Sequence, residues 1–225
     1  MDSVCVFCGS RDGNNPAYIA AARDTGAAIA RRGWLLIYGG GRTGLMGAVA
    51  DAALAEGGEV IGVMPRSLLT REQPHPGLTR LHLVTSMHRR KALMSSLSDG
   101  YLTLPGGYGT LEEFFETVTW AQLRLHSKPC ALLDVAGFWD HLLGLVNTAV
   151  VQGFVPAVDR GLIMSGKNPE ALLSRMEAYV PPPPVALPPD LPVDGPPVHR
   201  DLPPTSRNGR RRQSQARTRP PARRG

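Results

Sequence analysis

The segment Pro105–Glu113, with the sequence PGGYGTLEE, combines residues that can hold an anion with a carboxylate that can stabilise a positive charge. Its three glycines precede a predicted helix, so backbone N–H groups can approach a phosphate at the positive end of that helix. Thr110 can cap the helix, and Glu112 and Glu113 fall in its first turn. The spacing of Thr110 and Glu113 also matches a capping box, in which Glu113 binds only its own helix start. The residues alone leave both interpretations of Glu113 open.

A run of cations opens another predicted helix. Arg89, Arg90 and Lys91 follow Met87 and His88 directly. Cations at a helix N-terminus oppose the helix dipole by about 0.3–1 kcal/mol each. Their position therefore points to an anionic ligand, and a solvated basic face explains them equally well.

A second glycine-rich loop, Gly39–Gly44, satisfies the pattern G-x-G-x-x-G between a predicted strand and a predicted helix. A dinucleotide site also requires an acidic residue about 20 positions later, and none lies around Met64. We therefore expect no nicotinamide cofactor here. The glycines still allow backbone amides to approach a phosphate, which makes Gly40 and Gly41 candidate phosphate ligands.

Strands and helices that position these loops alternate along the first 180 residues. Short apolar runs predict strands at 4–8, 34–38, 60–64, 81–84, 101–104, 130–134 and 162–164. Helices are predicted at 15–32, 45–56, 86–97, 111–125 and 138–152, with a capped helix after Asn168-Pro169. Short strands separated by helices favour parallel pairing with right-handed crossovers. The prediction is an α/β protein with a single-domain, Rossmann-like, doubly wound parallel sheet, whose ligands bind beyond the carboxyl ends of the strands.

The C-terminal part of the chain differs in composition. Residues 181–225 hold 13 of the 21 prolines, 9 arginines and only 3 acidic residues, whereas residues 1–180 hold 16 basic and 16 acidic side chains. The net charge of +6 therefore belongs to this Pro/Arg-rich tail, which we expect to be disordered. A solubilising extension is favoured over weak nucleic-acid binding through the tail.

The remaining composition indicates the cellular setting. No apolar run approaches the about 18–20 residues that span a bilayer, and the chain opens directly into a strand without a signal peptide. We therefore expect a cytoplasmic protein without a membrane partner. Cys5 and Cys8 form a C-x-x-C spacing, but on a strand they point to opposite faces, which favours buried thiols over a metal or redox site.

The combination Met87-His88-x-Arg90-Lys91 with Glu113 of the PGGxGTxxE motif resembles the LOG ("lonely guy") family of cytokinin riboside 5′-monophosphate phosphoribohydrolases. Supporting stretches are 6–10, 38–41, 44–47, 60–65 and 119–123, so that the similarity covers nearly all of residues 1–180. The family was long mislabelled lysine decarboxylase. That label fits poorly, because residues 1–180 contain only Lys91, Lys128 and Lys167 and no recognisable pyridoxal-phosphate site.

The resemblance implies hydrolysis of the N-glycosidic bond of an (N6-substituted) adenosine 5′-monophosphate to free base and ribose 5-phosphate. It implies a catalytic pair, Arg90 and Glu113, in a homodimer whose active site lies at the subunit interface, without a cofactor or metal. The implied substrate site comprises Glu72, Arg90, Lys91, Gly107, Tyr108, Gly109, Thr110, Leu111, Glu112, Glu113 and Thr119, with the phosphate on Gly107, Gly109 and Thr110. Arg124 departs from the family, because a glycine is common there.

An alternative from another class is a non-catalytic carrier of a nucleotide or phosphorylated cofactor. The expected pair of Arg90 and Glu113 argues against it, because a pure phosphate binder gains nothing from a nearby carboxylate. The choice among bases is not predicted from the sequence.

Overall fold

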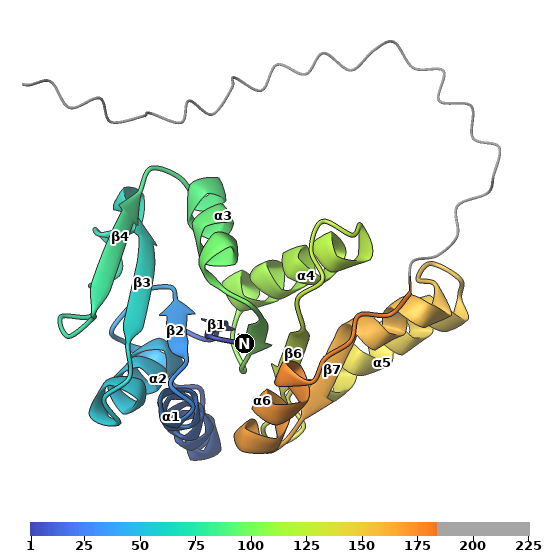
Figure 1. Ribbon diagram of the computed structural model, residues 1–225, viewed down its shortest axis with the longest axis horizontal. Helices are drawn as coiled ribbons and strands as arrows, with labels where there is room; N and C mark the ends of the chain where they lie inside the picture. The colour runs from blue at the N-terminus through green and yellow to red at the C-terminus, as the bar shows by residue number, and fades with distance from the viewer. Residues whose placement is uncertain (184–225) are drawn as a thin grey trace, which may run out of the picture. The chain divides into compact units, whose positions relative to one another are not determined.

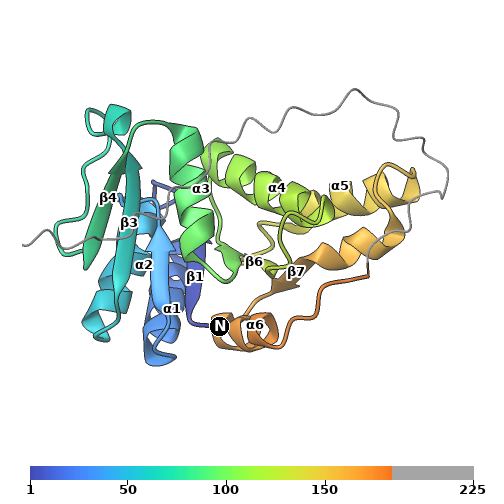
Figure 2. The same cartoon turned by 45° about the horizontal axis from the view of Figure 1, so that its top comes forward.

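The computed structural model describes residues 1–183, which form a seven-stranded parallel sheet with helices on both faces (Figures 1 and 2). The strands are β1 (Ser3–Phe7), β2 (Leu35–Tyr38), β3 (Val60–Pro65), β4 (Arg80–Val84), β5 (Tyr101–Thr103), β6 (Cys130–Leu133) and β7 (Ile163–Gly166). The α-helices are α1 (Pro16–Arg31), α2 (Gly44–Ala55), α3 (Met87–Leu97), α4 (Tyr108–Gln122), α5 (Asp140–Val151) and α6 (Pro169–Glu177), with short 3-10 helices η1 (Arg66–Leu68) and η2 (Ala157–Leu162).

The strand order β4-β3-β2-β1-β5-β6-β7 confirms the predicted α/β class and the doubly wound parallel sheet. The order reverses between β1 and β5, which is where such sheets bind ligands. At that point the backbone N–H of Gly9 donates to the carbonyl oxygen of Pro105 at 3.0 Å. This bond joins the loop after β1 to the glycine loop after β5. The tail predicted for residues 181–225 lies outside the described residues from position 184 onward.

Alternating side chains of β1 show how the sheet divides the core. Val4, Val6 and Cys8 pack in a cluster with α1, α2 and α6, whereas Cys5 and Phe7 pack in a second cluster with α3 and α4. The two thiols are free and buried on opposite faces, as predicted. Burial raises the pKa of the Cys8 thiol, which keeps it protonated and unreactive.

Three of the six α-helices in the described residues start with a side-chain cap. The side chains of Asn15, Ser86 and Asn168 accept hydrogen bonds from the first turns of α1, α3 and α6. The start of α4 differs from the prediction, because the helix begins at Tyr108 with Gly107 as N-cap instead of at Leu111 with Thr110 as N-cap. Thr110 is therefore the third residue inside the helix, and a capping box between Thr110 and Glu113 is wrong.

The end of α4 holds Arg124, at the position where a glycine is common in the family. Arg124 follows the helix with a φ of 60°, a left-handed conformation that favours glycine. Its guanidinium bonds the buried carboxylate of Asp159 at 3.2 Å and the carbonyl oxygens of Pro182 and Pro183. These bonds offset the backbone strain, which is typically about 1 kcal/mol.

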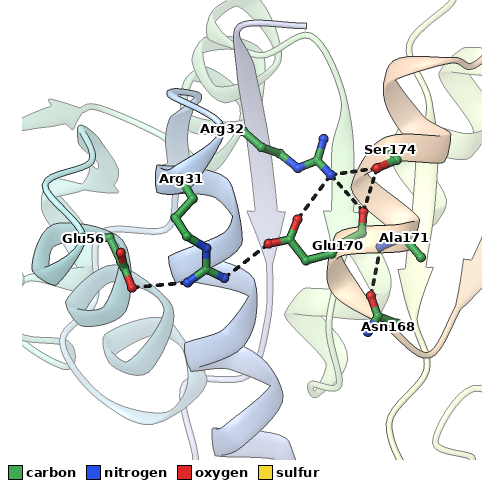
Figure 3. Close-up of polar contacts among 7 residues, drawn as sticks. All are labelled: Arg31, Arg32, Glu56, Asn168, Glu170, Ala171 and Ser174. Atoms are coloured by element: carbon green, nitrogen blue, oxygen red, sulfur yellow. Dashed lines mark hydrogen bonds and ion pairs between the residues drawn. The ribbon is translucent and has the colours of Figure 1, made fainter.

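A polar network ties α1 to its neighbours. Arg31 bridges Glu56 and Glu170, and Arg32 bonds both Glu170 and Ser174 of α6 (Figure 3). None of these residues belongs to the predicted site. Within residues 1–183 no helix is long and apolar enough to cross a membrane.

Candidate active site

Most of the predicted site residues line one cavity of about 220 Å³ at the point where the strand order reverses. The loop after β1, the glycine loop, the first turn of α4 and the start of α3 contribute to its walls. The predicted residues that line it are Glu72, Arg90, Gly107, Tyr108, Gly109, Thr110, Glu112 and Glu113. The expected meeting of a glycine loop, an arginine and a glutamate is therefore present in the structure.

Arg90 lies almost completely buried in this cavity. Its Nε donates to the carbonyl oxygen of Val63 at the end of β3, at 3.0 Å. A Cβ on Gly39 would lie only 2.3 Å from Arg90 Nη2 and 3.0 Å from Met46 Sδ. Gly39 thus makes the space that the guanidinium occupies, and the backbone fixes its direction.

Glu113 points from α4 toward this guanidinium. Its Oε1 lies 3.3 Å from Arg90 Nη1, and the Glu113 side chain is only 9% exposed. The contact is an ion pair without hydrogen-bond geometry, so that buried Oε1 accepts no hydrogen bond from the described residues. Burial raises the pKa of Glu113 to about 7, against the opposing effect of Arg90. The carboxylate is turned away from its own helix start and retains capacity for a hydrogen-bond donor.

Lys91, the next residue of α3, has a different environment. Its Nζ bonds Glu112 and also Glu116, the latter at 2.8 Å, and its side chain is 11% exposed. Burial lowers the pKa of Lys91, but the two carboxylates outweigh it and the net pKa is raised. Lys91 does not line the cavity in this structure.

Glu72 reaches the cavity from an irregular segment between η1 and β4. This segment is bonded to the loop after β2 through Arg42 N to Gln73 O at 3.2 Å and His75 N to Gly40 O at 2.9 Å. Gly41 also forms an isolated bridge with Pro74. The Gly39–Gly44 loop therefore holds the segment that carries Glu72.

Four predicted residues lie outside the cavity lining besides Lys91. Gly40 has a φ of +85° and packs against Gly62 of β3, and Gly41 does not line the cavity either, so the geometry gives their predicted phosphate contact no support. Leu111 packs toward α5. Thr119 lies on the exposed face of α4, where its hydroxyl donates to the carbonyl oxygen of Phe115 at 2.7 Å.

The sequence interpretation missed several residues that shape the site. Cys8, Ser10, Gly39, Met46 and Met87 line the cavity. Met87 stands in the motif that carries Arg90, and Gly39 opens the second glycine-rich loop, so both had a usable signal. Cys8, Ser10 and Met46 stand in stretches that resemble the family, but no pattern there marked them as cavity residues. A second cavity of about 530 Å³, with an apolar wall that includes Tyr18, Leu45 and Phe138, shares Gly9, Ser10, Gly107 and Tyr108 with the first.

Comparison with known proteins identifies the family. A family model described as possible lysine decarboxylase matches residues 46–176. A probable cytokinin riboside 5′-monophosphate phosphoribohydrolase of Oryza sativa is 48% identical over 180 residues, which cover 80% of this chain and 73% of the relative. The chain belongs to the LOG family.

Other LOG-family relatives come from distant organisms. Cytokinin riboside 5′-monophosphate phosphoribohydrolases of Rhodococcoides fascians and Arabidopsis thaliana are 46% and 44% identical over 177 and 178 residues. The matches cover 78% and 79% of this chain and 89% and 84% of the relatives. The similarity confirms the resemblance found from the two motifs.

Solved structures share the LOG-family fold at lower identity. The molybdenum cofactor carrier protein of Chlamydomonas reinhardtii is 19% identical with a TM-score of 0.60, over 80% of this chain and 99% of that chain. The molybdenum cofactor binding protein of Rippkaea orientalis is 20% identical with a TM-score of 0.59, over 79% and 96%. At this identity the likeness concerns the fold alone.

The described residues of this LOG-family chain offer no obvious metal site. Among residues 1–183, no three His, Cys, Asp or Glu side chains gather in an arrangement that would hold a metal ion. The cavity instead presents backbone amides, one guanidinium and carboxylates, which suit an anionic, hydroxyl-bearing ligand.

Proposed function

We propose that this LOG-family protein hydrolyses the N-glycosidic bond of a nucleoside 5′-monophosphate, an adenosine monophosphate with or without an N6 substituent, to free base and ribose 5-phosphate. The observation that carries the proposal is the buried carboxylate of Glu113, which is paired with Arg90 in the cavity wall while its Oε1 lacks a hydrogen-bond donor. A buried acceptor without a donor is costly. A ribose hydroxyl or the attacking water would satisfy it.

The phosphate of the substrate is proposed to bind at the start of α4. Leu111 N donates to Gly107 O, and the N–H groups of Tyr108, Gly109 and Thr110 precede this bond in the first turn. Such N–H groups have no partner within their own helix and carry its positive dipole end. They can bind a phosphate in the same cavity that Glu113 lines.

Cleavage places a positive charge on the ribose. As the C1′–N9 bond breaks, the base takes the bonding electron pair and a proton, and water supplies the hydroxyl that bonds to C1′. The ionised carboxylate of Glu113 stabilises the oxocarbenium-like transition state more than the neutral ground state, which is the requirement for catalysis. Arg90 fixes Glu113 and the nucleotide by charge-assisted contacts, and the bound phosphate supplies orientation.

Thr119 is proposed to contribute to the site of a second copy of the chain. It lies on the exposed face of α4, which also bears Phe115, 40% exposed, and is followed by Leu123, 63% exposed. Two copies packed through this face would bring Thr119 of one copy toward the cavity of the other and cover the apolar side chains. Light scattering should then give twice the chain mass, and a monomeric active enzyme would contradict the arrangement.

The function is tested by a panel of nucleoside 5′-monophosphates that includes AMP and an N6-prenylated AMP. Chromatography after incubation should show free base and ribose 5-phosphate in equal amounts. A nucleotide carrier would return every nucleotide intact while still binding it, and that outcome would replace the hydrolase with the alternative. Nucleosides without phosphate, run in parallel, test the proposed role of the α4 N-terminus.

A further inference from the structure

The two helices that carry Arg90 and Glu113 are connected by a second ion-pair cluster. Arg90 and Lys91 are consecutive residues of α3, and both contact carboxylates of α4. Because neighbouring residues on a helix point about 100° apart, they contact different carboxylates. Arg90 meets Glu113, and Lys91 Nζ lies between Glu112 and Glu116, which are one turn apart on the same face.

The cluster of Lys91, Glu112 and Glu116 is tightly bonded. Lys91 Nζ bonds both carboxylates, and the Lys91 and Glu116 side chains are 11% and 23% exposed. The Glu112 side chain is 53% exposed, so that the bond between Lys91 and Glu116 is the one shielded from solvent and stronger than an ordinary surface ion pair. Long side chains thus bridge α3 and α4 beside the cavity, within one turn of Glu113.

We propose that Lys91 and Glu116 are positioning residues, whose ion pair fixes α3 against α4 and so sets the distance between the Arg90 guanidinium and the Glu113 carboxylate. Neither Lys91 nor Glu116 lines the cavity. The role in turnover rests on the proposed function, whereas the effect on the Arg90–Glu113 pair does not. A displacement of about 1 Å in such a pair commonly costs one to two orders of magnitude in rate.

The charges around Glu113 predict the direction in which its pKa should shift in each variant. Arg90 and Lys91 on α3 favour its ionised form, and Glu112 and Glu116 on α4 oppose it, with Arg90 the largest of these charges. Cys5 of β1 and Cys8, directly after β1, are close enough to interact with Glu113, and Glu72 lines the same cavity. Removing the Lys91 charge should raise the pKa of Glu113, and removing the Glu116 charge should lower it.

The kinetic test compares Lys91→Met with Glu116→Gln. Both break the same ion pair, so both should lower kcat about tenfold with little change in KM. The acidic limb of kcat/KM should move to higher pH in Lys91→Met and to lower pH in Glu116→Gln. Titration of the substrate phosphate is common to both enzymes and cancels in the comparison. The double variant should be no slower than the slower single variant, because the two residues share one interaction.

A direct role of Lys91 in nucleotide binding gives a different pattern. Lys91→Met would then raise KM strongly, and Glu116→Gln would leave kcat, KM and the pH limb unchanged. If kcat falls in both variants but the acidic limb of the kcat/KM pH profile lies at the same pH in both, the contact between Lys91 and Glu116 is merely structural. Either pattern overturns the proposal.

A substrate-free measurement separates this proposal from the proposed function. Carboxyl ¹³C NMR of glutamate-labelled protein, with the Glu113 signal assigned through Glu113→Gln, should show the pKa of Glu113 moving in opposite directions in Lys91→Met and Glu116→Gln. If these pKa shifts occur but the protein hydrolyses no nucleotide, the positioning role of the cluster stands and the proposed hydrolase function is wrong. If the protein hydrolyses nucleotides but the pKa of Glu113 is the same in both variants, the hydrolase function stands and the positioning role of the cluster is wrong.

Discussion

Two ion pairs join the same helices, α3 and α4, but they differ in hydrogen bonding and in burial. Lys91 and Glu116 are 2.8 Å apart and hydrogen-bonded, whereas Arg90 and Glu113 are 3.3 Å apart, more deeply buried, and leave Glu113 Oε1 without a hydrogen bond. A buried polar atom without a partner lowers stability. The incompletely bonded carboxylate of Glu113 lines the cavity, where a ligand can supply the missing donor, and we therefore attribute its incomplete bonding to function.

The largest expected effect comes from replacing the incompletely bonded carboxylate. Glu113→Gln should lower kcat by about 10²-fold or more, because an amide cannot stabilise the positive charge on the ribose. Circular dichroism should show an unchanged fold. Glu56→Gln, at an exposed pair with Arg31, is the matched control and should retain full turnover. Near-normal turnover in Glu113→Gln would show that the Arg90–Glu113 pair has no catalytic role that distinguishes it from the Lys91–Glu116 pair.

The next effect concerns the substrate instead of the protein. Removing the 5′-phosphate should lower kcat/KM by about 10²-fold or more, because the α4 N-terminus then holds nothing that orients the sugar against Glu113. Steady-state rates of a nucleoside and its monophosphate give the ratio. If both are cleaved equally well, the glycine loop is not a phosphate site.

A third prediction uses stability and the raised pKa of Glu113, about 7 against its usual value of 4.5. Below about pH 4.5, Glu113 is protonated in the folded and unfolded states, and its burial costs least. As the pH rises through 4.5 to 7, ionisation favours the unfolded chain and wild type loses up to about 3 kcal/mol that Glu113→Gln keeps.

Urea unfolding of both proteins at about pH 5 and about pH 8 measures this difference. The stabilising effect of Glu113→Gln should be small at the lower pH and largest at the higher pH. A difference that is independent of pH would show that Glu113 is not held in a costly ionised state.

A smaller effect tests the space that Gly39 leaves for Arg90. Gly39→Ala should displace the guanidinium, lower kcat about tenfold and destabilise the fold by about 1–3 kcal/mol, because its Cβ would overlap Arg90 Nη2. Gly144→Ala is the control, since a Cβ there meets no atom within 4 Å in the exposed helix α5. That control should gain up to about 1 kcal/mol from helix propensity, with unchanged kinetics. Equal kinetics in the two variants would show that Arg90 is not confined by this loop.

The smallest effect is expected far from the cavity, in the network of Figure 3. Glu170 pairs with Arg31 and Arg32, but its side chain is 47% exposed. Glu170→Ala should therefore cost no more than about 1 kcal/mol in urea unfolding and leave kcat and KM unchanged. A larger loss, or altered kinetics, would show that an exposed ion pair remote from the cavity contributes more than its exposure predicts.

Much of the fold was predictable, because its signals are local. Asn15 and Asn168 mark the starts of α1 and α6, and the apolar runs correspond to the strands with shifts of one or two residues. The start of α4 was not predicted correctly, since Thr110 followed by Glu113 reads as a capping box. Only the tertiary partner Arg90, 23 positions away in the sequence, decides where Glu113 points.

The site was predictable in type and only partly in geometry. The motif residues Arg90 and Glu113 meet as expected, but the Gly39–Gly44 loop supports the Glu72 segment instead of lining the cavity with Gly40 and Gly41. Such backbone contacts leave no pattern in the sequence. The partners of Lys91 also escape local analysis, because Glu112 and Glu116 lie on another helix.

The central claim is that Glu113 faces the anomeric carbon of a nucleotide whose phosphate rests on the start of α4. A crystal structure of Glu113→Gln soaked with AMP tests it most directly. The account predicts the phosphate on the amides of residues 107–110 and the residue 113 side chain within hydrogen-bond distance of the ribose. A nucleotide bound elsewhere, or residue 113 turned back to its own helix start, would contradict it.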